Sequence, residues 1–123
     1  MGSGRMIIDE IKKELLEAEN ILNTEFSFEL AEPNYIRCIE LINANSDIKD
    51  DVEALIISMF EDKAVSSEPI AYLMYCLRWP RVKTWMEESL RNTPDAIATG
   101  APMEKVIDAY DDDWENKEFY KSI

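Results

Sequence analysis

The stretch that decides the fold is residues 70–77, IAYLMYCL, the longest apolar run in the chain. A helix formed by these residues is apolar on every side, which is typical of a helix covered by its neighbours. Few of the residues are β-branched, so a helix is favoured over a buried strand. Ser67 is a suitable N-terminal cap before the run, and Pro80 breaks the helix after it. The run therefore predicts one central helix, around which the rest of the chain packs.

Amphipathic helices are predicted on both sides of this run, because apolar residues recur there at spacings of three and four. The first covers about residues 6–23. The second begins at Glu32-Pro33, and the third carries its apolar residues at 52–60 behind a cap at Asp47 or Asp50. Pro80 and Pro102 are each expected to begin a further helix. Residues 111–123 are expected to form a short terminal helix capped by Asp111 or Asp112.

Two stretches do not follow this helical spacing. Residues 25–30 alternate apolar and polar side chains, which favours an extended connector. Residues 92–102 contain two prolines and a glycine, and we expect a connection with one short turn at 94–98. Successive helices with short links predict an all-α fold: a single-domain helical bundle or short α-solenoid of antiparallel hairpins, with about six helices. We interpret residues 1–5 as a cloning remnant and residues 6–123 as one domain.

The charge of the chain is strongly negative. It holds 26 acidic and 13 basic residues and no histidine, and its net charge is −13, yet 46% of its residues are hydrophobic. A disordered acidic tail has few apolar residues, so this composition favours a folded domain with a negative surface. Nucleic acid is disfavoured as a direct ligand, because phosphate contacts need clustered Lys and Arg. A basic protein surface is the natural complement.

The sequence argues against catalysis and bound metal. Without histidine, Cys38 and Cys76 have no imidazole base to activate them, and no Ser-His-Asp triad can exist. Cysteine and histidine clusters for zinc are absent, and residues 111–113 lack the alternation and the glycine of a calcium loop. We therefore expect no catalytic residue, no metal and no cofactor. A small enzyme that uses carboxylates or Cys38 remains an alternative.

The expected compartment is the cytoplasm. The longest apolar run is too short to span a membrane, and the first residues lack the apolar region of a signal peptide. Both Cys38 and Cys76 lie inside apolar helical patterns and are expected to be reduced thiols in the core. We expect no membrane partner.

Two acidic surfaces are candidates for partner binding. The first combines carboxylates with aromatic residues near the C-terminus, a composition typical of binding hot spots. Its predicted partner-binding residues are Asp108, Asp111, Asp112, Asp113, Trp114, Glu115, Glu118 and Tyr120. The second surface comprises Asp47, Asp50, Asp51 and Glu53. Trp114 and Phe119 have an alternative role, docking the last helix on the core. Arg78 and Arg81 are expected to bind the carbonyls at helix ends or to pair with the acidic run at residues 111–113.

Two segments carry a resemblance to a known class of protein. Residues 68–80, EPIAYLMYCLRWP, and residues 111–120, DDDWENKEFY, resemble segments of small acidic helical immunity proteins of bacterial toxin systems. These systems include nuclease bacteriocins and contact-dependent growth inhibition or polymorphic toxins. The resemblance implies a protein that binds one cognate toxin domain, one-to-one, and covers the basic active-site region of a nuclease. The alternative function is a non-catalytic helical adaptor or regulatory subunit that binds another basic protein.

Overall fold

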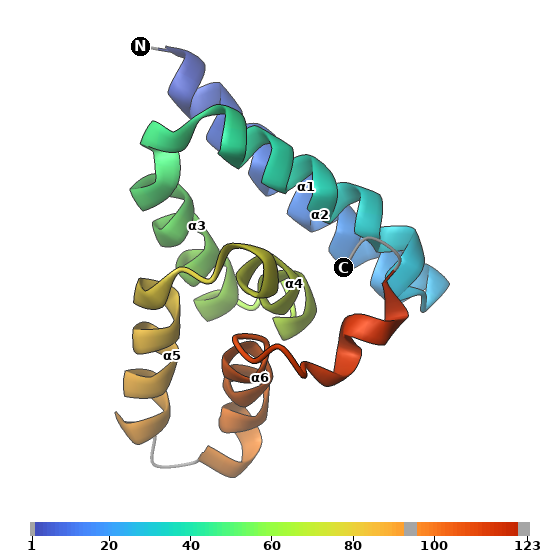
Figure 1. Cartoon of the computed structure of the whole chain (residues 1–123), viewed down its shortest axis with the longest axis vertical. Helices are drawn as coiled ribbons and strands as arrows, with labels where there is room; N and C mark the ends of the chain where they lie inside the picture. The colour runs from blue at the N-terminus through green and yellow to red at the C-terminus, as the bar shows by residue number, and fades with distance from the viewer. Residues whose placement is uncertain (1, 93–95, 121–123) are drawn as a thin grey trace.

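The computed structural model describes residues 2–92 and 96–120 and contains helices without any strand in these residues (Figure 1). The α-helices are α1 (Gly2–Glu25), α2 (Phe28–Ala44), α3 (Lys49–Glu61), α4 (Ser67–Leu77), α5 (Pro80–Asn92) and α6 (Ala96–Asp108). Two 3₁₀ turns, η1 (Ser46–Ile48) and η2 (Glu115–Phe119), complete the described part. The predicted all-α single-domain bundle of about six helices is confirmed.

The helices pack as two pairs around α4. Figure 1 shows α1 and α2 side by side as an antiparallel hairpin, with α5 and α6 at the other end of the molecule. Helix α3 connects the two ends, and α4 lies between them. Every residue of α4 from Glu68 to Met74 is buried, so the prediction of a central, covered helix is confirmed. Beyond α6, the C-terminal segment returns to the α1–α2 hairpin.

Cys76 departs from the expected core position. It lies on α4 beyond the fully buried stretch, and its side chain is exposed, whereas Cys38 on α2 is completely buried. Both cysteines are free thiols. The end of α4 emerges from the core just before the helix terminates at Leu77, which explains why an apolar sequence pattern misplaced this residue.

Non-glycine residues in the left-handed region follow three of the helices. Phe26 after α1, Lys63 after α3 and Arg78 after α4 have φ angles of 54°, 59° and 53°. At such a helix end the amide of the left-handed residue bonds back to one of the last helical carbonyls, as Arg78 N does to Met74 O at 2.7 Å. Glycine usually occupies this position because a Cβ atom is disfavoured there. Arg78 and the following Trp79 therefore separate α4 from α5, in agreement with the predicted break before Pro80.

The predicted start of the second helix was wrong. Helix α2 begins at Phe28, so residues 28–30 are helical and not an extended connector. Ser27 is extended, and its hydroxyl accepts a hydrogen bond from Leu30 N at 3.4 Å, which caps the helix before the expected start. Pro33 is the sixth residue of α2, where it has no N–H to donate to the carbonyl of Glu29.

The expected aspartate and serine caps were also wrong. Helix α3 follows η1 directly, and its N-cap is Ile48 without a side-chain bond. Asp47 lies in η1, and Asp50 lies in the first turn of α3, where the helix dipole favours negative charge. At α4 the N-cap is Ser66, not Ser67, and its hydroxyl donates to Glu19 Oε1 at 2.9 Å.

The last two predicted helices differ from the structure as well. Helix α6 begins at Ala96 and contains Pro102, which was expected to begin it. The turn expected at 94–98 is therefore helical from residue 96, and residues 94 and 95 lie outside the described residues. The expected helix over 111–123 is the short 3₁₀ turn η2, whose N-cap is Trp114 and not an aspartate. Residues 121–123 of that expectation also lie outside the described residues.

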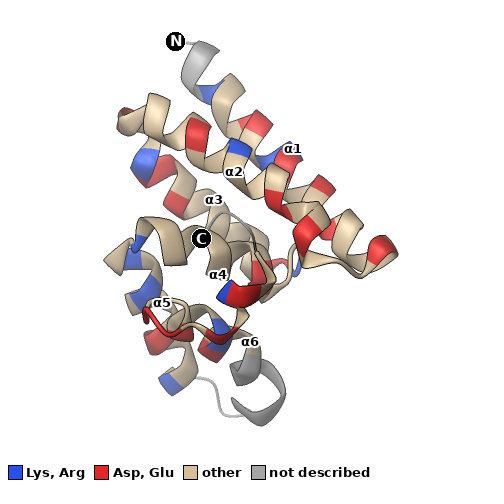
Figure 2. Ribbon diagram, turned by 45° about the vertical axis from the view of Figure 1, so that its right-hand side comes forward, with Lys and Arg blue, Asp and Glu red and all other residues tan. Residues whose placement is uncertain are grey.

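Charged residues are unevenly distributed over these elements. Figure 2 shows acidic residues along α1 and α2 and in the loop after α6, whereas several basic residues lie on α5. Trp79 is buried and Trp85 is half-buried against the same core. None of the helices in the described residues is long and apolar enough to cross a membrane.

Candidate functional site

The acidic residues after α6 lie on a well-defined turn, residues 108–113, which we call the acidic turn. Asp111 N donates to Asp108 O at 3.1 Å, and Trp114 N donates to Asp111 O at the same distance. The carboxylate of Asp111 accepts a hydrogen bond from Asp113 N at 3.2 Å, an aspartate turn that fixes the local backbone. The run of three aspartates is therefore a structured surface feature.

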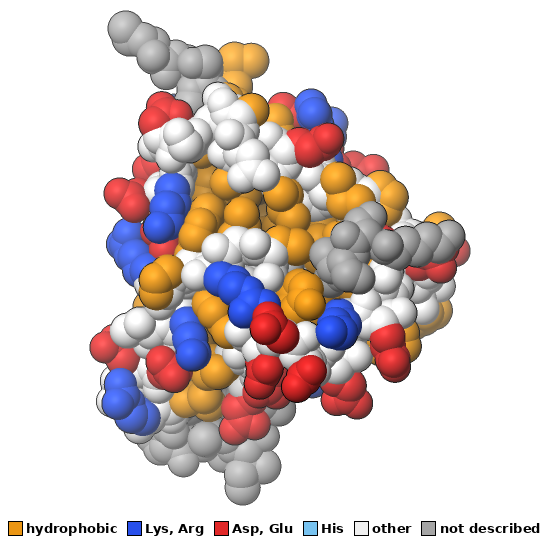
Figure 3. Space-filling model, in the orientation of Figure 1, with side chains coloured by type: hydrophobic (Ala, Val, Ile, Leu, Met, Phe, Trp, Pro, Cys, Tyr) orange, Lys and Arg blue, Asp and Glu red, His pale blue; other side chains and the backbone are white. Residues whose placement is uncertain are grey.

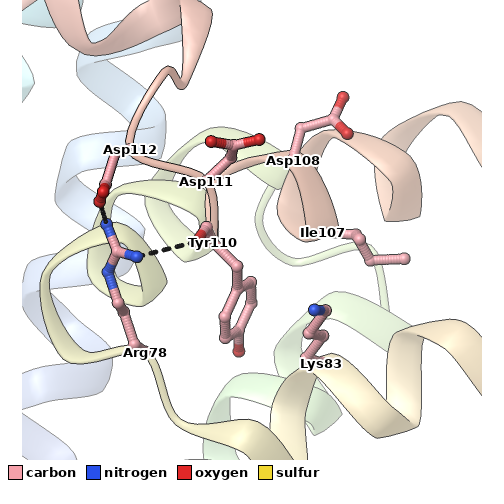
Figure 4. A pocket seen from close by; sticks show the side chains of 7 residues that line it. All are labelled: Arg78, Lys83, Ile107, Asp108, Tyr110, Asp111 and Asp112. Atoms are coloured by element: carbon pink, nitrogen blue, oxygen red, sulfur yellow. Dashed lines mark hydrogen bonds and ion pairs between the residues drawn. The ribbon is translucent and has the colours of Figure 1, made fainter.

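Arg78 holds the acidic turn against the end of α4 (Figure 4). Its guanidinium donates through Nη2 to Asp112 Oδ1 at 2.6 Å and through Nη1 to Tyr110 O at 2.9 Å. Its Nε donates to Tyr75 O at 3.2 Å, near the end of α4. Arg78 thus fulfils both predicted roles, binding a helix carbonyl and pairing with the acidic run. Figure 4 also shows the carboxylates of Asp108 and Asp111 directed away from it.

Most of the predicted partner-binding residues are exposed to solvent. The exposed members are the carboxylates Asp108, Asp111, Asp112, Asp113, Glu115 and Glu118. Figure 3 shows carboxylates gathered beside Lys and Arg side chains near the lower centre of one face. The two predicted aromatic members differ, because Trp114 and Tyr120 are each only 5% exposed. They lie in the chain's own core and are not part of this surface.

Trp114 and Tyr120 anchor the C-terminal segment, residues 114–120. Their rings stack on each other with centroids 5.9 Å apart, and Trp114 also packs on Tyr75 at 5.3 Å. The Tyr120 ring contacts Tyr72 edge-on at 4.7 Å. Trp114 therefore has the alternative role predicted for it, because it docks the C-terminal segment on the core. For Phe119 the side chain remains 47% exposed, although its ring lies 5.1 Å from that of Phe28.

A buried carboxylate, Glu68 at the start of α4, fastens this segment. It is 8% exposed and accepts hydrogen bonds from the Tyr120 hydroxyl at 3.0 Å and from Asn116 Nδ2 at 3.1 Å. Burial raises the pKa of Glu68, while these hydrogen bonds and the more distant Lys105 act in the opposite direction. We did not predict this role from the sequence, although the signal for it is a glutamate two residues before the all-apolar run.

A second buried Tyr–Glu pair lies beside the first. The Tyr72 hydroxyl donates to Glu32 Oε2 at 2.8 Å, and Glu32 is 3% exposed. Burial, and then the hydrogen bond to this carboxylate, raise the pKa of Tyr72. The neighbouring Tyr35 is fully buried, and its hydroxyl lies near Tyr120 without a hydrogen bond of good geometry. These groups form a polar centre within an aromatic cluster that joins α2, α4 and the C-terminal segment.

The second predicted surface is smaller than expected. Asp47, Asp50 and Asp51 are exposed, and we call them the α3 acidic surface. Glu53 is only 2% exposed and lies 3.8 Å from Arg81 Nη1, so it does not belong to that surface. The same guanidinium nitrogen lies 3.9 Å from Asp50 Oδ1. Part of the local negative charge is therefore balanced within the chain.

Hollows flank the acidic turn on both sides. One, of about 420 Å³, is lined by Arg78, Lys83, Ile107, Asp108, Tyr110, Asp111 and Asp112 (Figure 4). The Lys83 ammonium lies 5.6 Å from the centre of the Tyr110 ring in this hollow. The other, of about 340 Å³, reaches from the acidic turn to Glu68 and Asn116. The mixture of acids, bases and amides suits polar contacts with another molecule.

The thiols do not have the surroundings of a catalytic nucleophile. Cys38 is fully buried and burial raises its pKa to about 12, so its reactive thiolate form is scarce at neutral pH. Its Sγ lies 3.8 Å from Ile11 O. Cys76 is exposed, but its pKa is also raised, to about 11. Within residues 2–92 and 96–120, no group of three or more Cys, Asp or Glu residues is arranged to hold a metal ion.

Comparisons with known proteins do not assign the chain to a family. No protein-family model, curated protein or solved structure matches the chain.

Proposed function

We propose that this chain is an immunity protein that binds a cognate bacterial toxin domain and neutralises it. The partner is a basic domain, a nuclease, bound one-to-one. In this proposal the acidic turn covers the basic active-site region of the toxin, and the chain itself is non-catalytic and acts in the cytoplasm. Its carboxylates occupy positions that the phosphates of nucleic acid take in the nuclease.

The observation that carries the proposal is the set of exposed carboxylates on a fixed backbone. Asp108, Asp111 and Asp113 are exposed and have no ion pair with a described basic residue. The turn that holds them is fixed by Arg78 and by the buried Trp114. Because the turn is already ordered, less conformational entropy is lost when a partner binds.

Charge supports the proposed kinetics of binding. A nuclease cleft is basic because it holds phosphates, and a chain with a net charge of −13 is attracted to it over a distance. Such steering raises association rates by as much as about 10³-fold over an uncharged pair. Rapid capture is useful to a protein that must neutralise a toxin before damage occurs.

Co-expression tests this function directly. A toxin gene next to the gene of this chain is identified first, and the chain is then expressed with that toxin domain. We expect growth to be restored and a one-to-one complex to be isolated by size-exclusion chromatography with light scattering. The variant Asp111→Asn/Asp112→Asn/Asp113→Asn is expected to protect less well. The matched variant Asp47→Asn/Asp50→Asn/Asp51→Asn removes the same charge from the α3 acidic surface and is expected to protect like the wild type.

Two results would contradict the proposal. Growth arrest despite abundant, folded chain would show that it does not neutralise this toxin. A stable complex with a basic protein that is not a toxin, and that keeps its activity when bound, would favour the adaptor function.

A further inference from the structure

Exposed aromatic side chains gather where the α1–α2 connection meets the C-terminal segment. Phe26 is 86% exposed and Phe119 is 47% exposed. Phe28 links them, because its ring lies 5.1 Å from that of Phe119 and lines a hollow of about 360 Å³ together with Phe26 and Leu22. Figure 1 shows the C-terminal segment ending beside this helix connection. We call Leu22, Phe26, Phe28 and Phe119 the aromatic patch.

The backbone of Phe26 has an unfavourable conformation, although its side chain is mostly exposed to solvent. Its φ angle of 54° lies in the left-handed region, which is unfavourable for a bulky residue. An exposed side chain gains little burial to offset this strain. The same conformation also follows α3 and α4, so the observation that points to a partner is the exposed ring of Phe26 and not its backbone angle. Contact with another molecule would explain why a phenylalanine occupies this position.

The charges around the aromatic patch indicate the chemistry of that molecule. Glu25 and Glu118, both exposed, directly precede Phe26 and Phe119 in the chain. The hollow of the patch also shares Glu68, Lys105 and Asn116 with the hollow below the acidic turn. The patch and the acidic turn therefore adjoin. A second copy of this chain is disfavoured, because two surfaces of the same negative sign repel each other.

We propose that the aromatic patch is the anchor of the interface with the basic toxin domain. Phe26 and Phe119 become buried against an apolar depression of the toxin, and Lys or Arg residues at its edge pair with Glu25 and Glu118. This assignment rests on the proposed function and gives the two surfaces different roles in the kinetics of binding. The acidic turn sets the association rate, whereas the aromatic patch sets the dissociation rate, because buried aromatic residues carry much of the affinity of an interface.

Surface plasmon resonance with an inactivated form of the toxin domain used for co-expression tests the assignment. Phe26→Ala is expected to dissociate at least about 10-fold faster, with its association rate within about twofold of the wild type. Phe119→Ala is expected to change in the same direction. Leu30→Ala is the matched control, because Leu30 is 54% exposed and does not line the hollow of the patch. Thermal unfolding checks that each variant is folded.

The outcomes separate this assignment from the proposed function. If both phenylalanine variants dissociate at the wild-type rate while the Asn variant of the acidic turn associates slowly, the assignment is overturned and the proposed function stands. If the wild-type chain does not bind the toxin domain, both are overturned. If sedimentation shows a dimer of the free chain that Phe26→Ala converts to a monomer, the patch is a self-association surface and the assignment is overturned.

Discussion

Arg78 is the residue on which the position of the acidic turn depends most directly. It is placed by its left-handed backbone after α4, and its guanidinium reaches Tyr75 O, Tyr110 O and Asp112. Its side chain is 41% exposed and that of Asp112 is 87% exposed, so solvent screens the ion pair. The interaction therefore fixes the local geometry more than it stabilises the whole fold.

Replacement of Arg78 by glutamine is expected to loosen the turn locally. Amide hydrogen exchange at Asp113 and Trp114 should become about fivefold faster, which corresponds to about 1 kcal/mol for a pair at the surface. The midpoint of thermal unfolding should change little. Arg91→Gln removes the same charge from the last turn of α5 and is expected to leave these amides unchanged. Equal exchange in the wild type and Arg78→Gln would show that Arg78 does not hold the turn.

At the scale of elements, the C-terminal segment is joined to α4 by the carboxylate of Glu68. Burial disfavours the charged form of this group. Because the pKa of Glu68 is raised in the fold, the folded state binds its proton more tightly than the unfolded state does. The contribution of this group to stability is therefore greatest below the pKa of an ordinary glutamate. It declines as the pH rises through the raised pKa of the folded state.

Glu68→Gln should remove this dependence on pH. The glutamine oxygen can still accept from Tyr120, but the side chain carries no charge to bury. We expect the variant and the wild type to unfold similarly near pH 4, with the variant gaining stability relative to the wild type as the pH rises towards 7. Urea unfolding across this range measures the difference, and Glu118→Gln is an exposed control. A difference that does not change with pH would contradict the assigned cause.

The helices were predictable from sequence because apolar residues at helical spacing and an all-apolar run identify buried faces directly. Their ends were less predictable. Helix α2 begins at Phe28, directly after its cap Ser27 and before the expected Pro33, and α6 begins at Ala96 before Pro102. Pro33 and Pro102 lie in the second turn of their helices, so a proline preceded by other helical residues does not mark the first residue of a helix.

The candidate site was predictable in its charge and less so in its aromatic residues. Six of the eight residues in the first predicted surface are exposed carboxylates, because charged groups remain in solvent unless a partner is available. Trp114 and Tyr120 are buried, whereas Phe26 and Phe119 are exposed. Spacing along the chain does not distinguish these cases, since the burial of each ring depends on contacts with α2 and α4 that are distant in sequence.

At the scale of the whole molecule, the central claim is that negative charge is concentrated where the partner binds. The chain carries a net charge of −13, and acids also lie along α1, α2 and the first turn of α3. General attraction by this charge and specific steering by the acidic turn make different predictions. Only specific steering depends on where the charge is removed, because screening at moderate salt limits the range over which each exposed charge acts to about 10 Å.

The most direct test is the association rate with the inactivated toxin domain, measured by stopped flow from about 0.05 to about 0.5 M salt. The wild-type rate is expected to fall steeply with salt. Asp111→Asn/Asp112→Asn/Asp113→Asn should associate about 10-fold more slowly at low salt and depend less on salt. Asp47→Asn/Asp50→Asn/Asp51→Asn, with the same net charge, should remain close to the wild type. Equal rates for the two triple variants, or a wild-type rate independent of salt, would contradict the account.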